Sequence, residues 1–337
     1  MEFRIGPYDS YLENGDIYSS DDFLIRTQEL IVNDFKVKIP VDCEELKLTY
    51  FEDPIFQMGP LRPRNKEYPI RSFDLKILSR LTNLKKLDMS FIKISVYSIN
   101  FDNITLLTKL EELRLPNNDL RFLPLKILEL TNLKKLSLID SLFQRFNFDI
   151  DKLVNLEVLE LGNSKIKRLG DKLKGLEKLK FLDISYTNID GVEFKKILED
   201  SFPPNLESLK MIGTDLKNVD IDLSILTKLK FLDITLCKKF GEFILPISIE
   251  EIKMNGRSGS LTNLLKGKTW PNLKIICAQE VDLSLDAADF PSLSTFDEHG
   301  YDGFFLAPLL EILNLKNARN WRYDFNLDLF PNLIELN

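Results

Sequence analysis

Apolar and polar positions alternate along this chain in a pattern that returns about every 23 residues. Residues 110–115 read LEELRL, residues 133–138 read LKKLSL, residues 156–161 read LEVLEL and residues 179–184 read LKFLDI. A fixed period of this length predicts a solenoid of stacked coils, not a globule wound around one centre. We therefore expect the functional surface to be a long face and not a single pocket.

Each unit begins with the pattern LxxLxL, and most successive units start 20 to 27 residues apart. The twelve first positions are Leu84, Leu110, Leu133, Leu156, Leu179, Leu206, Leu229, Ile249, Leu273, Leu293, Leu310 and Leu333. An earlier, degenerate copy begins at Cys43. The pattern is least regular from about residue 249 onward.

The alternation predicts which side chains are buried. In xLxLx the two leucines point to one side of a strand and the x residues to the other. One unit cannot bury its leucines alone, so stacked units form a parallel sheet over a continuous core. Return segments at 125–130, 149–153 and 192–202 are expected to be helical or short helical turns. Asp190-Gly191 marks the start of the last of these and Pro203-Pro204 marks its end.

The repeated LxxLxL register resembles the leucine-rich repeat family, of the intracellular type without cysteine caps. The resemblance covers roughly residues 43–337. It implies an α/β solenoid of about 12 repeats, a curved right-handed coil with a parallel β-sheet on its concave face and helices or turns on its convex face. Residues 1–42 do not repeat, and we expect them to form a small β-rich N-terminal cap.

The turn after each strand has buried backbone groups that need hydrogen-bond partners. Members of the family usually place asparagine at this position. Here the position holds Asn118, Ser141, Ser164, Thr187, Thr214 and Cys237. Hydroxyl groups can satisfy part of the demand. The three cysteines lie far apart in the sequence, which predicts reduced, buried or half-buried thiols.

Both ends of the chain and one insertion depart from the pattern. Asn14-Gly15 predicts a hairpin turn in the first segment, although residues 9–22 are also suited to a docking arm. Residues 57–71 form an irregular basic insertion, interpreted as a solvated connection or a basic binding loop. The sequence ends on a strand-like segment without a cap. Three explanations remain open for this end: the chain continues, another subunit of a larger complex covers the edge, or its exposure is tolerated.

Composition narrows the class of protein. The net charge of −7 comes from 52 acidic and 45 basic residues, which argues against a nucleic-acid footprint. No apolar run approaches the length of a membrane span. Residues 1–10 lack a secretory signal, and together with the cysteine pattern this predicts a cytoplasmic location, with secretion by a signal-less route left open.

Catalytic motifs are lacking. His299 is the single histidine and has no nucleophile nearby in the sequence. Gly267-Lys268-Thr269 resembles the end of a phosphate-binding loop, but Thr262 stands where that loop needs glycine. We therefore expect no enzymatic activity, no cofactor, no metal and no small-molecule substrate.

The x residues of the strands are the candidate binding surface. Their central column carries mixed charge, and apolar and aromatic side chains flank it between about residues 139 and 236, a composition expected of a protein-binding patch. The residues predicted to contact a protein partner are Ile139, Val158, Glu160, Phe181, Asp183, Tyr186, Lys210, Ile212, Phe231, Asp233 and Leu236. Phe181 and Phe231 share the context KFLDI, which also suits a purely structural role.

Three functions fit these observations. The first is a non-enzymatic adaptor, regulator or inhibitor that binds a partner through its concave face, with the acidic balance favouring a basic partner. The second is the targeting region of a larger enzyme, such as a ubiquitin ligase or kinase, or of a secreted effector. The third is a structural subunit of a multi-protein assembly.

Overall fold

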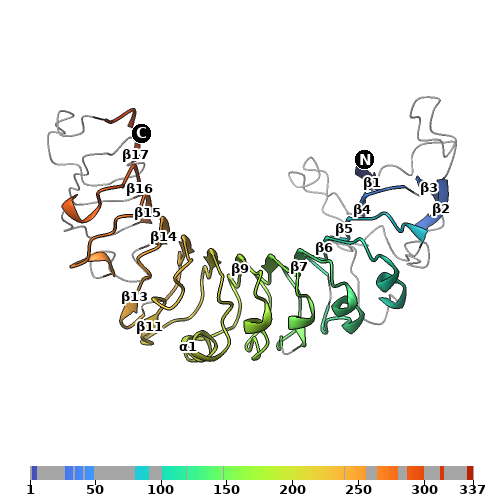
Figure 1. Ribbon diagram of the computed structural model, residues 1–337, viewed down its shortest axis with the longest axis horizontal. Coiled ribbons are helices and arrows are strands. Elements are labelled where there is room, and N and C mark those ends of the chain that lie inside the picture. Colours follow the sequence, from blue (N-terminus) through green and yellow to red (C-terminus); the bar gives the residue numbers. More distant parts are fainter. Residues whose placement is uncertain are drawn as a thin grey trace, which may run out of the picture. The chain divides into compact units, whose positions relative to one another are not determined.

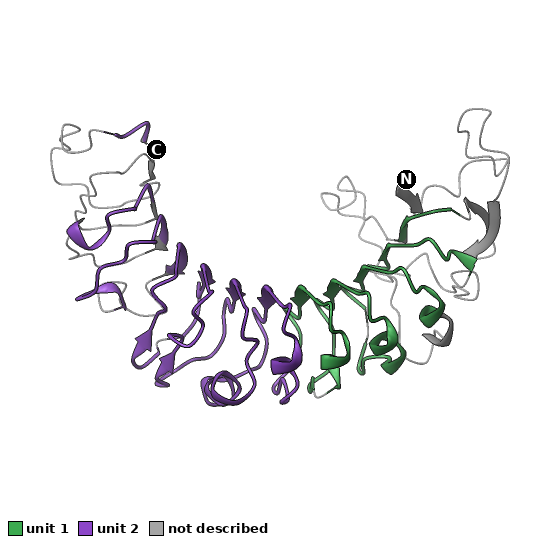
Figure 2. Cartoon of the chain, in the orientation of Figure 1, with its two compact units in different colours: residues 1–165 green, residues 166–337 purple. Residues whose placement is uncertain are grey.

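The computed structural model describes most of the repeats and parts of the two end segments. The described residues are 2–5, 27–32, 35–40, 42–48, 80–90, 101–118, 120–146, 148–238, 240–255, 264–279, 287–299, 312–314 and 332–336. The chain divides into two compact units, residues 1–165 and residues 166–337, which Figure 2 colours separately. Each unit is a stack of short strands joined by return segments (Figure 1).

In unit 1, short parallel strands lie side by side in chain order. They are β4 (Glu45–Leu48), β5 (Lys86–Asp88), β6 (Glu112–Arg114), β7 (Lys135–Ser137) and β8 (Val158–Glu160). The middle residues of these strands are in register and buried: Leu46, Leu87, Leu113, Leu136 and Leu159. The leucine register predicted from the sequence is confirmed in this unit.

Unit 2 repeats the arrangement. Its parallel strands are β9 (Phe181–Asp183), β10 (Ser208–Lys210), β12 (Phe231–Asp233), β14 (Glu251–Asn255), β15 (Ile275–Gln279), β16 (Thr295–His299), β17 (Ile312–Asn314) and β18 (Glu335–Leu336). Leu182, Leu209 and Leu232 align and are fully buried. Phe296 pairs with Leu313, and Leu313 pairs with Leu336. The predicted register therefore holds beyond residue 249, where the sequence pattern is least regular.

The return segments follow the length of each repeat. The three repeats that begin at Leu110, Leu133 and Leu156 are each 23 residues long, and their returns contain the short 3₁₀ helices Leu125–Glu129, Ile150–Lys152 and Leu173–Gly175. The interval from Leu179 to Leu206 is 27 residues, and it holds the α-helix α1 (Gly191–Asp200). The three predicted helical segments are thus confirmed, two of them as 3₁₀ helices. No helix among the described residues has the length and apolar character needed to cross a membrane.

Helix α1 begins where the sequence provides a cap. The Asp190 carboxylate accepts a hydrogen bond of 2.9 Å from the Glu193 backbone N–H, which satisfies one of the free donors of the first turn. Phe194, Ile197 and Leu198 are buried on one face of the helix. In the next two repeats the return segments instead form the two-stranded parallel sheet of β11 (Ile221–Asp222) and β13 (Phe243–Ile244).

Three strands are described in the N-terminal segment. β1 (Glu2–Ile5) pairs in parallel with β4, while β2 (Thr27–Val32) and β3 (Phe35–Pro40) form an antiparallel hairpin. The predicted turn at Asn14-Gly15 and the basic insertion at 57–71 lie outside the described residues. The domain boundary at residue 42 stays a prediction.

The residue that precedes each strand alternates in charge from one repeat to the next. Lysine and glutamate of neighbouring repeats form exposed ion pairs here: Lys85–Glu44 at 2.8 Å, Lys134–Glu111 at 2.9 Å, Lys230–Glu207 at 3.6 Å and Lys274–Glu250 at 2.7 Å. Exposed pairs of this kind contribute little to stability, because water and salt screen them. The pairs account for part of the mixed charge on the strand side without invoking a partner.

Candidate functional site

The strand pairing defines the columns of side chains that face away from the core. The predicted central column consists of Asp88, Arg114, Ser137 and Glu160 in unit 1, and of Asp183, Lys210, Asp233, Lys253, Cys277, Asp297 and Asn314 in unit 2. These residues are register partners within each unit, so the predicted column is confirmed. Whether they contact a partner stays a prediction.

In unit 1, three of the predicted site residues lie at neighbouring positions. Val158 and Glu160 are on β8, and Ile139 follows β7 in the adjacent repeat. Lys135 reaches diagonally across the two strands, and its Nζ lies 3.0 Å from Glu160 Oε1. The other oxygen, Glu160 Oε2, is buried and has no hydrogen-bond partner among the described residues. The Lys135 ion pair therefore fixes one oxygen of the Glu160 carboxylate and leaves the other without a hydrogen bond among the described residues.

In unit 2, Phe181 and Phe231 carry the same structural contact. The Lys210 Nζ lies 5.6 Å from the centroid of the Phe181 ring, and the Lys253 Nζ lies 5.5 Å from that of Phe231. Each lysine belongs to the repeat that follows its phenylalanine. A cation over an aromatic face is stabilising. The two half-buried phenylalanines thus link neighbouring repeats, which agrees with the structural role that the shared KFLDI context suggests.

Asp183 and Asp233 organise the turns after their strands. Asp183 Oδ1 accepts a hydrogen bond of 2.9 Å from the Ser185 N–H, and Asp233 Oδ1 accepts one of 3.0 Å from the Thr235 N–H. Asp233 is only 7% exposed. The geometry gives both carboxylates a role within the fold, and their contact with a partner stays a prediction.

The turn itself contains a backbone feature that recurs in every described central repeat. The third residue after the central column has a positive φ, between 53° and 69°, at Asn117, Asp140, Asn163, Tyr186, Gly213 and Leu236. Asparagine, aspartate and glycine are the residues that tolerate this left-handed region, whereas large side chains are uncommon there. Tyr186 and Leu236 are therefore exceptions in their own column.

Both exceptions point large side chains into solvent. Tyr186 is 51% exposed and Leu236 is 41% exposed. The backbone of Tyr186 is fixed by a hydrogen bond of 2.6 Å from its N–H to the Ile212 carbonyl. Its ring lies against Gly213, where an added Cβ would come within 2.7 Å of Tyr186 Cδ1. Backbone strain at a partly exposed position is found at many functional sites.

The structure separates four residues that the sequence grouped together. Ile139 and Ile212 occupy one position of the turn. The Ile139 carbonyl accepts a hydrogen bond from the backbone N–H of Asn117, and the Ile212 carbonyl accepts one from that of Tyr186, each in the preceding repeat. Tyr186 and Leu236 occupy the next position, which has the positive φ. The sequence carried a signal for this difference, because four of the six residues at the second position are asparagine, aspartate or glycine.

The thiol of Cys237 belongs to the buried hydrogen-bonding position of the turn. Its Sγ donates to the Met211 carbonyl oxygen of the preceding repeat at 3.0 Å, much as Asn118 Nδ2 donates to the Met89 carbonyl. Ser141 Oγ and Thr187 Oγ1, at the same position, instead donate to carbonyls of their own repeats, those of Leu138 and Ile184. Burial raises the pKa of Cys237 to about 12. The thiol is therefore protonated at neutral pH, which is unsuited to redox or nucleophilic chemistry. No group of three potential metal ligands occurs within the described ranges.

Comparison with solved structures identifies similar folds. An internalin, InlF, from Listeria monocytogenes has a TM-score of 0.51 at 17% identity, over 77% of this chain and 75% of that chain. A leucine-rich repeat protein of Leptospira interrogans has a TM-score of 0.54 at 21% identity, over 88% and 84%. The functional domain of InlJ from Listeria monocytogenes, which includes a cysteine ladder, has a TM-score of 0.50 at 18% identity.

That third match covers 87% of this chain but only 56% of InlJ's own chain. No family model matches the sequence, and no curated protein matches it. Identities of 17–21% support a shared fold and nothing finer. Together with the aligned leucine columns of both units, these likenesses establish that the chain has the leucine-rich repeat solenoid fold predicted from its sequence.

Proposed function

We propose that this chain is a non-enzymatic module that binds another protein through the strand side of unit 2. The observation that carries the proposal is the pair Tyr186 and Leu236, two large, partly exposed side chains at a turn position where the other four described central repeats have asparagine, aspartate or glycine. Tyrosine is one of the residues that most often dominate the energy of protein interfaces, and Leu236 adds apolar surface that a partner can bury. Lys210 and Ile212 lie between them in the sequence and complete a mixed apolar and charged surface.

The neighbouring site residues have supporting roles in this proposal. Phe181 and Phe231 position Lys210 and Lys253, so the rings act on a partner through the lysines above them. Ile139, Val158 and Glu160 belong to unit 1, and their part in binding stays a prediction, as does the cytoplasmic location. An adaptor, regulator or inhibitor role is the finer form of the proposal.

The test replaces the two anchors with the residue that the backbone prefers. Tyr186→Asn and Leu236→Asn together remove both large side chains and keep a residue that tolerates positive φ. The matched control is Asn163→Gly, an exposed residue at the same turn position in another repeat. Wild-type and variant proteins are used as bait in a quantitative affinity purification from the source cells, and their unfolding is measured alongside.

We expect the double variant to lose at least about 90% of a partner that the wild type and the control both retain, since anchor residues typically cost 2 kcal/mol or more when removed. Its unfolding transition should stay close to that of wild type. Equal recovery of the same partners by all three proteins would rule out this surface as the binding site.

A further inference from the structure

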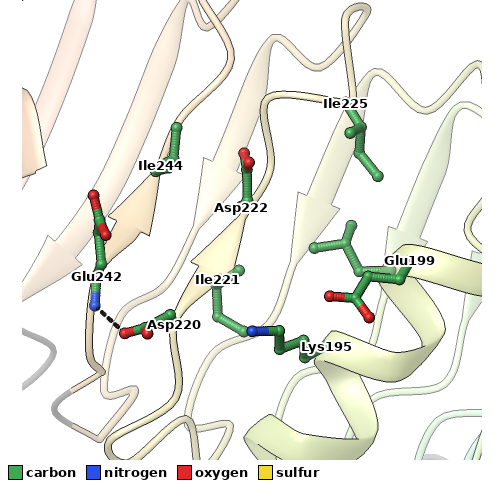
Figure 3. A pocket seen from close by; sticks show the side chains of 9 residues that line it. Lys195, Glu199, Asp220, Ile221, Asp222, Ile225, Glu242 and Ile244 are labelled. Atoms are coloured by element: carbon green, nitrogen blue, oxygen red, sulfur yellow. Dashed lines mark hydrogen bonds between the residues drawn. The ribbon is translucent and has the colours of Figure 1, made fainter.

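Unit 2 has a cleft on the side away from its long sheet. The cleft lies between α1 and the two-stranded sheet of β11 and β13, and it has a volume of about 350 Å³ (Figure 3). Leu198, Ile221, Ile225 and Ile244 supply its apolar surface. Ile225 is 57% exposed, so an aliphatic surface is open to contact at this point. The volume is at the lower end of the range for ligand-binding clefts.

The rim of the cleft is acidic. Glu199 on α1, Asp220 and Asp222 near β11, and Glu242 before β13 line it together with a single lysine, Lys195. Figure 3 shows Lys195 and Glu199 reaching from the helix toward β11. No ion pair between these side chains and the rest of the described residues is present. The Lys268 ammonium, outside the lining, interacts electrostatically with Asp222. The lining itself still carries four carboxylates and one lysine, which favours a basic ligand.

Two of the carboxylates are held in place by the backbone. Asp220 Oδ1 accepts a hydrogen bond of 2.7 Å from the Glu242 N–H, drawn as a dashed line in Figure 3. Gly241 makes room for that carboxylate, because an added Cβ would lie only 2.1 Å from Asp220 Oδ1. Asp222 Oδ1 accepts a hydrogen bond of 2.9 Å from the Ser224 N–H. Hydrogen bonds from the Ser224 hydroxyl and then its N–H lower the pKa of Asp222, so this carboxylate is charged at neutral pH.

One edge of the small sheet faces the cleft. The N–H groups of Ile221 and Leu223 donate to the carbonyls of Glu242 and Ile244, each at 2.8 Å. Successive residues of a strand direct their backbone groups to opposite sides, so the N–H and C=O of Asp222 point toward α1. β11 pairs with β13 alone in this sheet. An unpaired strand edge is a template for an added strand.

We propose that this cleft binds a short extended segment of a partner protein in which basic residues flank an aliphatic one. The segment lies along the edge of β11, its aliphatic side chain contacts Ile225 and Ile244, and its basic side chains pair with Glu199 and Glu242. The described carboxylates do not converge on one point as metal ligands do, which favours an extended cation over a single metal ion. The proposal does not depend on the strand-side surface, which lies on the other side of the unit.

A defined peptide tests the proposal directly. The probe is a fluorescein-labelled peptide of sequence Gly-Lys-Ile-Arg-Val-Lys-Gly, and binding to the full chain is measured by fluorescence anisotropy at low salt. The first variant carries Glu199→Lys and Glu242→Lys, two exposed positions. The matched control carries Asp171→Lys and Glu177→Lys, which makes the same change of charge at exposed positions that do not line the cleft.

We expect the cleft variant to bind the peptide at least about tenfold more weakly than wild type, and the control to stay within about threefold. The milder pair Glu199→Gln and Glu242→Gln should weaken binding in the same direction. A third variant, Ile225→Glu, separates docking from general attraction. It adds negative charge, so attraction alone strengthens binding, whereas loss of the aliphatic contact weakens it.

Weaker binding by both the Ile225→Glu variant and the cleft charge variants supports the proposal. It is overturned if the wild type does not bind the peptide up to about 1 mM, if the cleft and control charge variants lose affinity equally, or if Ile225→Glu binds more tightly. Tyr186→Asn with Leu236→Asn should leave peptide affinity unchanged, so failure of the strand-side proposal and failure of this one are distinguishable.

Discussion

Two leucines four residues apart in one repeat should differ sharply in what they contribute to stability. Leu232 is fully buried in the centre of β12, between Leu209 and Ile252 of the flanking strands. Leu232→Ala removes three carbon atoms from the core, worth about 2.4 kcal/mol at roughly 0.8 kcal/mol each. The cavity adds a further cost, because stacked neighbours relax only in part, which brings the expected loss to about 3–5 kcal/mol.

Leu236 has the opposite balance. It is 41% exposed and has a φ of 59°. Its burial is about three-fifths of complete, so removal of the side chain gives up roughly 1–1.5 kcal/mol of apolar burial. Asparagine tolerates the left-handed backbone, which costs leucine about 1 kcal/mol or more. These contributions nearly cancel, and Leu236→Asn should change the free energy of unfolding by less than about 1 kcal/mol.

Urea unfolding followed by far-UV circular dichroism measures both variants against wild type. Unfolding in a solenoid can proceed in parts, because each repeat contacts only its neighbours. The unfolding transition is therefore followed both by circular dichroism at several wavelengths and by tryptophan fluorescence, and the midpoints are compared. Trp270, which is buried in unit 2, contributes to the fluorescence signal. A loss below about 1 kcal/mol for Leu232→Ala, or equal losses for the two variants, would refute the assignment of one leucine to the core and the other to the surface.

Two further predictions concern the buried position of the turns. Asn118→Ala should lower the free energy of unfolding by about 2–3 kcal/mol, because Asn118 Nδ2 donates hydrogen bonds to the buried carbonyls of Met89 and Leu115. Ser164→Ala should be neutral or slightly stabilising, because Ser164 Oγ is buried without a partner among the described residues. Thermal melts of the two variants check this difference. Cys237 should resist alkylation in the folded protein up to strongly alkaline pH, since burial raises its pKa to about 12. It should react rapidly at about pH 8.5 once urea unfolds the chain. Mass spectrometry of the labelled peptide measures both rates, and equal rates for the folded and unfolded protein would contradict the prediction.

The sequence predicted the core because a single constraint governs it. A residue at the middle of a strand must be apolar in every repeat, so Leu182, Leu209 and Leu232 could be aligned by spacing alone. The same constraint carried the register past residue 249, where Ile276 pairs with Ile252 although the surrounding residues differ. The helix at α1 was also predictable, since Asp190 supplies its cap and the long interval supplies its length.

The features that escaped prediction depend on more than one repeat. The ammonium group above the Phe181 ring belongs to Lys210 of the next repeat, and the residue spacing within one repeat does not predict this contact. The acidic cleft arises because a helix in one return segment is followed by a strand in the next. The hydrogen bond of Asp233 to its turn depends on the direction of the Thr235 backbone N–H. Such contacts follow from three-dimensional neighbours, which a periodic pattern does not specify.

A solenoid allows each repeat to act as a reference for the others. On the strand side of this chain, the residues before the strands form ion pairs between repeats, and the central aspartates bond to the turns that follow them. These side chains are constrained by the stack itself. The position with positive φ is different, because the fold restricts its backbone and leaves its side chain half-buried or exposed. Asparagine, aspartate or glycine meets that restriction at the least cost. A tyrosine or leucine is unusual at this position, and 51% of Tyr186 and 41% of Leu236 stays exposed, so each offers a large side chain that a partner can contact. This exposure is the physical reason to propose recognition at Tyr186 and Leu236.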